Sequence, residues 1–273
     1  MKTVLCTLAV AAVCAGCGNN LAGPGGSSPF GPPGGLAALS VDSAHVRLVW
    51  IPPSDAADTG FAGYVLAWGN VRDTLAKSAT GFTAGPLQRG AMSFSIRSLL
   101  KNGQVSDAAA IIWAPAWRFD AFPITVTEYN SSQQTGNPGV DAGTGTTNPE
   151  AVGLLDANAD STLDFYLWGP SGSPLQLLSA SVYNPGWHQT LFSTESTPAS
   201  DLNAPLASFP PDNTFSLQFV TLEDYTIYYV KTVGNTGEIN YARVHVHILP
   251  GTYPARSVEI RISLQRVSRL AYA

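Results

Sequence analysis

The sequence predicts an all-β protein made of two tandem β-sandwich-like domains. Only 12% of its 273 residues are charged, whereas it contains 26 glycines and 20 prolines. Helical surfaces are usually rich in Glu, Lys and Arg, so this composition favours strands joined by many turns. Short runs of alternating apolar and polar residues recur along the chain with turn residues between them.

The first sixteen residues have the pattern of a secretory signal. Lys2 is followed by the apolar stretch Val4–Val13 and then by small residues. The stretch is shorter than the about 20 residues that a membrane-spanning helix needs. Residues 1–16 are therefore predicted to be a signal peptide. A signal cut at another position and a retained membrane anchor are the alternatives.

The run Cys14-Ala15-Gly16-Cys17 resembles the lipobox of bacterial lipoproteins, although Cys14 stands where leucine is commonest. The resemblance implies that Cys17 becomes the lipidated first residue, carrying acyl chains such as palmitate, and that the protein is lipid-anchored in the cell envelope. In Gram-negative lipoproteins an aspartate directly after the cysteine signals inner-membrane retention. Gly18 stands there, so the outer membrane is expected.

The rest of the chain lacks cysteine, because all three cysteines lie within the first seventeen residues. That distribution agrees with secretion and excludes disulfides, cysteine-bound zinc and thiol catalysis from the exported part. Residues 17–35 are predicted to be a tether, because Gly and Pro at this density form neither helix nor sheet. The net charge of −5 and the lack of a basic run exclude non-specific nucleic-acid binding.

Residues 36–118 contain the strand-like runs of the first domain. Alternation places Val46, Leu48 and Trp50 on one face. The runs expected to be strands are 36–41, 46–50, 64–68, 71–75, 93–99 and 105–113. Several such strands without helices predict a β-sandwich.

The residues Leu39, Val46-x-Leu48-x-Trp50-x-Pro52-Pro53 and Tyr64-x-Leu66 resemble the first half of a fibronectin type III domain. The resemblance implies that Trp50 and Tyr64 pack in the core and that the domain is a spacer or binding module. The later part of the family pattern is a leucine, a proline and a tyrosine, and Leu99, Lys101 and Val105 stand at those places. Only the leucine matches, so the fold is expected to be irregular near Val105.

Residues 119–273 are predicted to be a second all-β domain, either a jelly roll or a sandwich. Expected strands are 123–129, 164–168, 177–183, 215–219 and 258–265, and 225–232 and 239–248 form a hairpin. The polar segment 131–150 is expected to be a mobile loop or a binding loop. The connecting segment 111–119 is a poor flexible linker, so the domains are expected to pack together there, with Trp113 or Trp117 at the junction.

Part of the hairpin, from Tyr228-Tyr229-Val230-Lys231-Thr232 to Asn240-Tyr241-Ala242-Arg243-Val244, is similar to a hairpin of HmuY-like surface lipoproteins. Some of those proteins bind haem through paired histidines. His245 and His247 lie two residues apart on a predicted strand, so their side chains face the same way, as a haem or metal pocket requires. Two histidines on a solvated sheet face explain the pattern as well.

A calcium loop is a second candidate site. Asp156, Asn158 and Asp160 offer oxygen ligands at alternate positions, and Asp164 follows four residues later. Ser161 stands where an EF-hand has glycine, and Leu167 stands where it has the bidentate glutamate. A solvated turn rich in Asp and Asn accounts for the same residues.

Catalytic motifs are missing from the sequence: it has no Gly-x-Ser-x-Gly elbow, His-Glu-x-x-His or phosphate loop. We therefore expect a non-enzymatic envelope lipoprotein that acts as a binding or structural module and needs no cofactor. A ligand-capture lipoprotein that binds haem or another small molecule through the C-terminal domain is the alternative. A glycosidase whose carboxylates meet only in the fold is a further alternative. The expected partners are the membrane, through the lipid, and a protein or glycan, since Tyr183 and Trp187 can stack on sugar rings.

Overall fold

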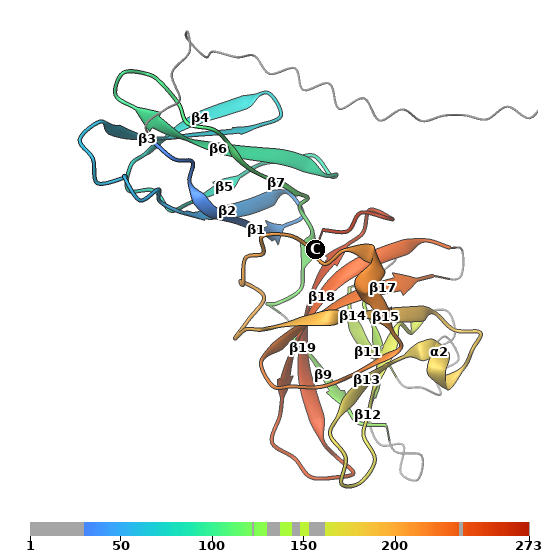
Figure 1. The fold of residues 1–273 in the computed structure, drawn as a ribbon. Helices are drawn as coiled ribbons and strands as arrows, with labels where there is room; N and C mark the ends of the chain where they lie inside the picture. The colour runs from blue at the N-terminus through green and yellow to red at the C-terminus, as the bar shows by residue number, and fades with distance from the viewer. Residues whose placement is uncertain are drawn as a thin grey trace, which may run out of the picture.

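A computed structural model describes residues 30–121, 123–129, 137–143, 148–152, 162–234 and 237–272. The all-β fold class is confirmed, since strands dominate the described residues (Figure 1). The strands of the first sandwich are β1 (Gly34–Asp42), β2 (His45–Ile51), β3 (Phe61–Trp68), β4 (Val71–Ala76), β5 (Gly81–Ala84), β6 (Met92–Leu100) and β7 (Ala109–Trp113). No helix in the described ranges is long and apolar enough to cross a bilayer.

Two antiparallel sheets form the first sandwich, in the orders β1-β2-β5 and β4-β3-β6-β7. The predicted inward face of β2 is confirmed, because Val46, Leu48 and Trp50 are all buried. The rings of Trp50 and Tyr64 meet edge to face with centroids 5.4 Å apart, as the fibronectin type III resemblance implies. Trp68, beside a turn, is buried against Phe82.

The irregularity expected near Val105 is also confirmed. Val105 makes one isolated bridge to Leu99, and β7 begins four residues later than the predicted strand. Side chains complete the backbone pairing here: the Ser106 hydroxyl accepts a hydrogen bond from the Ser98 amide at 2.9 Å, and Arg97 donates to the Ser106 carbonyl at 2.7 Å.

The second sandwich also has two sheets, in the orders β11-β10-β12-β13-β16 and β15-β14-β17-β18-β19-β8, with β9 paired to β19. A short helix α2 (Ala180–Tyr183) and a 3-10 turn η1 (Asp212–Thr214) interrupt the strands. The strands are β8 (Trp117–Arg118), β9 (Ile124–Thr127), β10 (Gly139–Asp141), β11 (Glu150–Val152), β12 (Phe165–Trp168), β13 (Gln176–Ser179), β14 (Gln189–Pro198), β15 (Phe215–Leu217), β16 (Phe219–Thr221), β17 (Thr226–Val233), β18 (Ile239–Ile248) and β19 (Ser257–Gln265).

The predicted hairpin is confirmed: β17 and β18 pair from Thr226 opposite Val246 to Val233 opposite Ile239. Alternate residues of β18 and β19, including Val244 and Ile262, fill the core between the sheets. The other face of β18 carries Tyr241, Arg243, His245 and His247 in sequence order. This second face points toward the junction described below.

The predicted single strand over residues 215–219 is wrong. β15 pairs with β14 in one sheet, whereas β16 pairs with β13 in the other, so the chain crosses between the sheets near Gln218. The segment 131–150, predicted to be a loop, contains β10, which is held by β11 and β12 on either side. A three-residue strand is too short to produce a periodic pattern.

Candidate functional site

The junction between the two sandwiches is where segments distant in sequence meet. Trp113 is fully buried, and its indole Nε1 donates a hydrogen bond to the Ser40 hydroxyl at 3.1 Å. That hydroxyl in turn donates to the Ala114 carbonyl at 2.9 Å. The ring of Tyr272 lies 5.8 Å from that of Trp113, so the C-terminal segment closes the same contact.

Trp117, the second tryptophan predicted at the junction, makes cation–π contacts with two arginines. The guanidinium of Arg89, from the loop after β5, lies 4.5 Å from the Trp117 ring centroid, and that of Arg266 lies 5.4 Å away. Each such contact contributes on the order of 0.5–1 kcal/mol at an exposed site. Trp117 therefore joins the first sandwich, through Arg89, to the end of β19.

A loop of the second sandwich, residues 199–206, crosses to the first and is called the strap here. The Ala38 amide donates to the Leu206 carbonyl at 2.8 Å, and the Leu206 amide donates to the Ala38 carbonyl at 2.9 Å. This pair of bonds attaches the strap to the free edge of β1. Leu202 of the strap is fully buried and belongs to one continuous apolar cluster that also contains Trp50 and Tyr241.

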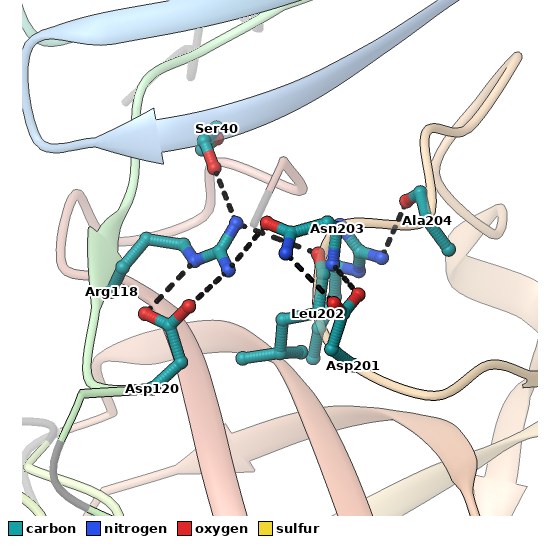
Figure 2. Close-up of polar contacts among 8 residues, drawn as sticks. Ser40, Arg118, Asp120, Asp201, Leu202, Asn203 and Ala204 are labelled. Carbon is teal, nitrogen blue, oxygen red and sulfur yellow. Dashed lines mark hydrogen bonds and ion pairs between the residues drawn. The ribbon is translucent and has the colours of Figure 1, made fainter.

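Arg118 connects the strap, β1 and β8 (Figure 2). Its Nη1 donates to the Ser40 carbonyl at 3.1 Å and to the Leu202 carbonyl at 3.5 Å. Its Nη2 donates to the Asn203 side-chain oxygen at 3.1 Å and forms an ion pair with Asp120 Oδ2, while Nε donates to Asp120 Oδ1. All three guanidinium nitrogens are thus engaged, and the planar fork fixes the geometry of three segments at once.

Two residues of β18 hold the strap from beneath. Arg243 Nη2 donates to the Ala204 carbonyl at 2.7 Å, and His245 Nε2 lies 2.9 Å from the Ala199 carbonyl. Both side chains are buried, and burial lowers the pKa of Arg243 to about 10 and also lowers the pKa of His245. Arg243 Nε and His245 Nδ1 have no hydrogen-bond partner in the described residues.

Beside the strap lies a pocket of about 580 Å³. Leu39, Val41 and Val49 provide apolar side chains from the outer face of the β1–β2 pair, and Arg47 lies among them. Arg118, Asp120, Asn203 and Pro205 complete the lining from the second sandwich. Clefts of this size at domain interfaces are common sites for small ligands.

The sequence-predicted ligand residues are not gathered at this junction as a set. His245 and His247 share a face of β18, as predicted, but His245 is covered by the strap. His247 is partly exposed, with Nδ1 2.9 Å from Asp224 Oδ1 and its ring stacked on Tyr225 at 4.4 Å. Haem ligation by His245 through Nε2 would require breaking its contact with Ala199. Their ligand role stays a prediction, which an absorption spectrum unchanged by added haem would exclude.

The calcium candidates fall mostly outside the described residues, as do Cys17 and the tether up to residue 29. Asp156, Asn158 and Asp160 belong to that set. Asp164 is described and is fully buried, with Oδ2 accepting from the Ala142 amide at 2.9 Å and Oδ1 lying 3.2 Å from His188 Nδ1. Over the described ranges, no group of three or more His, Cys, Asp and Glu side chains is arranged to hold a metal.

Asp164 belongs to a small titratable group inside the second sandwich. Burial raises the pKa of Asp164, although its hydrogen bond with His188 opposes that shift. The same hydrogen bond raises the pKa of His188. Burial also raises the pKa of Asp141 to about 6. These side chains are buried and bond to neighbouring backbone or to each other, which suits a structural role.

Aromatic side chains gather near Trp187, but of the four rings in this group only Tyr183 is exposed, whereas Tyr166 is buried. Tyr183 stacks on Trp187 with ring centroids 5.3 Å apart, and Tyr129 and Tyr166 meet Tyr183 edge to face. Each ring therefore covers part of another, which leaves less flat surface for a sugar ring.

Sequence reasoning missed Ser40, Arg118, Arg243 and the strap. One signal was present: Arg243 lies between Ala242 and Val244 within the predicted strand 239–248, and a charged side chain that is buried in a sheet needs a polar partner. The strap reads as an ordinary turn-rich segment, Ser-Asp-Leu-Asn-Ala-Pro, and gives no sign of its distant contacts.

Comparisons with known proteins find fibronectin type III domains at low structural similarity. No family model matches the sequence, and no curated protein matches it. The fibronectin type III domain of human collagen alpha-1(XX) chain has a TM-score of 0.29 and 20% identity, and the match covers 35% of this chain and 93% of that domain. The sixth such domain of human fibronectin type III domain containing protein 3 has a TM-score of 0.25 and 17% identity, over 34% and 93%. A solved structure entitled "Myokine structure" has a TM-score of 0.25 and 10% identity, over 31% and 97%.

Proposed function

We propose that this protein is a non-enzymatic, lipid-anchored module of the cell envelope, whose two β-sandwiches act as one rigid structural or binding unit. The junction carries the proposal. Tandem domains move relative to each other by default unless their interface is extensive. Here the Arg118 contacts, the strap and the shared apolar cluster all oppose such motion.

A rigid body on a Gly/Pro-rich tether suits a module that presents a surface at a fixed shape while the tether supplies reach. The tether, residues 17–35, is expected to be flexible from its composition. Specificity would then lie in the surfaces of the two sandwiches and at their junction. In the outer membrane, where we propose the protein resides, the Cys17 acyl chains anchor it.

Distance measurements test the rigidity. Replacing the three cysteines by serine gives a chain in which spin labels can be placed at V71C on β4 and F219C on β16, both exposed positions. A single narrow distance distribution is expected for the otherwise native chain. The double variant R118A/L202A should broaden it. A broad distribution in the native background would contradict the proposal.

Labelling with palmitate tests the anchor separately. Cells that express the native chain should incorporate labelled palmitate into the protein, and C17A should abolish the incorporation. C14A is the matched control, because Cys14 lies in the predicted signal and should leave labelling of the mature chain intact. Absence of label from the native chain would rule out lipidation.

A further inference from the structure

The pocket beside the strap has an apolar floor and a free cation. Leu39 on β1 stands directly opposite Arg47 on β2, so both side chains emerge on the same, outer face of the sheet. Val41 and Val49 extend the apolar surface of that face. Pro205 of the strap lines the same pocket, so an aliphatic chain placed there can contact carbon of both sandwiches.

Arg47 differs from the other charged side chains of the pocket. The residue is exposed, and its guanidinium forms no ion pair or hydrogen bond with the described residues. Arg118 is engaged at all three nitrogens, and Asp120 is paired with it. The lining therefore has a net charge of +1 from two arginines and one aspartate, in a chain whose net charge is −5.

From these features we infer that the pocket binds a small aliphatic monocarboxylate. The carboxylate pairs with the Arg47 guanidinium, whose planar fork matches it, and the aliphatic chain lies over Leu39, Val41 and Val49. Asp120, which also lines the pocket, disfavours a second negative charge there, so a dicarboxylate fits worse. This inference goes beyond the proposed function, which stands whether or not the pocket is occupied.

Titration calorimetry with the native chain and sodium hexanoate tests the inference. Hexanoate should bind at one site, and hexylammonium, with the same chain and the opposite charge, should bind at least about tenfold more weakly, since a hydrogen bond to a charged group has about that effect. Adipate should also bind more weakly than hexanoate. Equal binding of hexanoate and hexylammonium, or tighter binding of adipate, would overturn the inference.

Two arginine variants locate the site. R47Q should weaken hexanoate binding about tenfold. R72Q is the matched control, because Arg72 is also an exposed strand arginine but lies on β4, outside the pocket. Unchanged binding by R47Q, or equal losses in both variants, would contradict the assignment. A tripeptide ending in valine that binds tenfold tighter than hexanoate would show that a chain-terminal carboxylate, and not a free acid, is the ligand.

A variant that narrows the pocket is an independent test of where hexanoate binds. V49F places a larger apolar side chain on the partly exposed outer face of β2, where the first sandwich can accommodate it without repacking its core. It should abolish hexanoate binding while the spin-label distance of the proposed rigid unit stays unchanged. If V49F still binds hexanoate, the pocket is not the binding site. If V49F broadens the distance distribution as well, the proposed rigid unit is also contradicted.

Discussion

At the scale of single residues, Arg118 and Arg243 both hold the strap, but their surroundings differ. Arg118 has a carboxylate partner, Asp120, and all its nitrogens are engaged. Arg243 is more deeply buried. Among the described residues its side chain donates only to the Ala204 carbonyl, at 2.7 Å, and it forms no ion pair with a carboxylate. Removing one member of an ion pair lowers the free energy of unfolding strongly, because it leaves the other charge without a partner. A buried charge that has no ion-pair partner already costs desolvation energy in the native protein.

Replacing Arg118 should therefore destabilise the protein strongly. R118A removes a largely buried member of an ion pair and leaves the Ser40 and Leu202 carbonyls without this donor, so the free energy of unfolding should fall by about 3 kcal/mol. R118K keeps the positive charge but not the planar guanidinium, so its free energy of unfolding should lie between those of R118A and the native chain. Urea denaturation measures both. A loss below about 0.5 kcal/mol for R118A, typical of an ordinary surface position, would contradict the role given to this residue.

His245 should make the stability depend on pH. Because burial lowers the pKa of His245 in the folded state, the unfolded chain binds a proton more readily than the folded one. The stability that His245 contributes is complete above the unfolded pKa, near 6.5, and is lost as the pH falls through the lower folded value. H245Q keeps a donor for the Ala199 carbonyl without titrating, so it should lose less stability than the native chain between pH 7.5 and pH 5.

Asp141 makes the stability change with pH in the opposite direction to His245, so its contribution has to be separated from that of His245. Its pKa is raised to about 6 by burial, so the folded state favours the protonated carboxyl, and stability decreases as the pH rises from about 4 through 6. This contribution is the same in the native chain and in H245Q, and it cancels in the difference between them. Identical dependence of stability on pH in the two proteins would show that the pKa of His245 is the same in the folded and the unfolded chain, which contradicts this prediction.

At the scale of elements, the regular strands were predictable and the elements stabilised by polar contacts were not. β2, β17 and β18 alternate clearly, so a period of two residues identified them. β14 is not predicted from the sequence, because two of its buried residues, Thr190 and Ser193, are polar. The Thr190 hydroxyl donates to the Asp164 carbonyl at 2.6 Å, which satisfies a buried polar group that hydrophobic periodicity cannot detect.

The strap is the element whose contribution can be measured most directly. L202A removes a fully buried side chain from the cluster shared by both sandwiches, and it should lower the free energy of unfolding by about 3 kcal/mol. L217A is the matched control, because Leu217 is a leucine of the same sandwich that is 39% exposed. Thermal unfolding of the two variants and the native chain measures the difference. Similar midpoints for L202A and L217A would mean that the strap is only loosely packed.

At the scale of the whole molecule, the sequence predicted where the two domains join but not what holds them. Trp113 and Trp117 marked the junction because large aromatic residues in a stiff connecting segment usually find a partner surface. Contacts between residues that are far apart in the chain, such as Ser40 with Arg118 and Arg118 with Asn203, leave no local pattern. The candidate site was for the same reason invisible, because its pocket exists only where the strap and the β1–β2 pair come together.

The strap also imposes an order of events on the newly made chain. β1 and its sandwich are synthesised well before Leu206, so the edge at Ala38 is uncovered until most of the polypeptide exists. An open strand edge can pair with another chain, and contacts between distant residues form slowly. During this interval the open edge of β1 can pair with another chain before the strap covers it. Slowing the synthesis of residues 199–206 should therefore increase aggregation more than slowing the synthesis of any later segment.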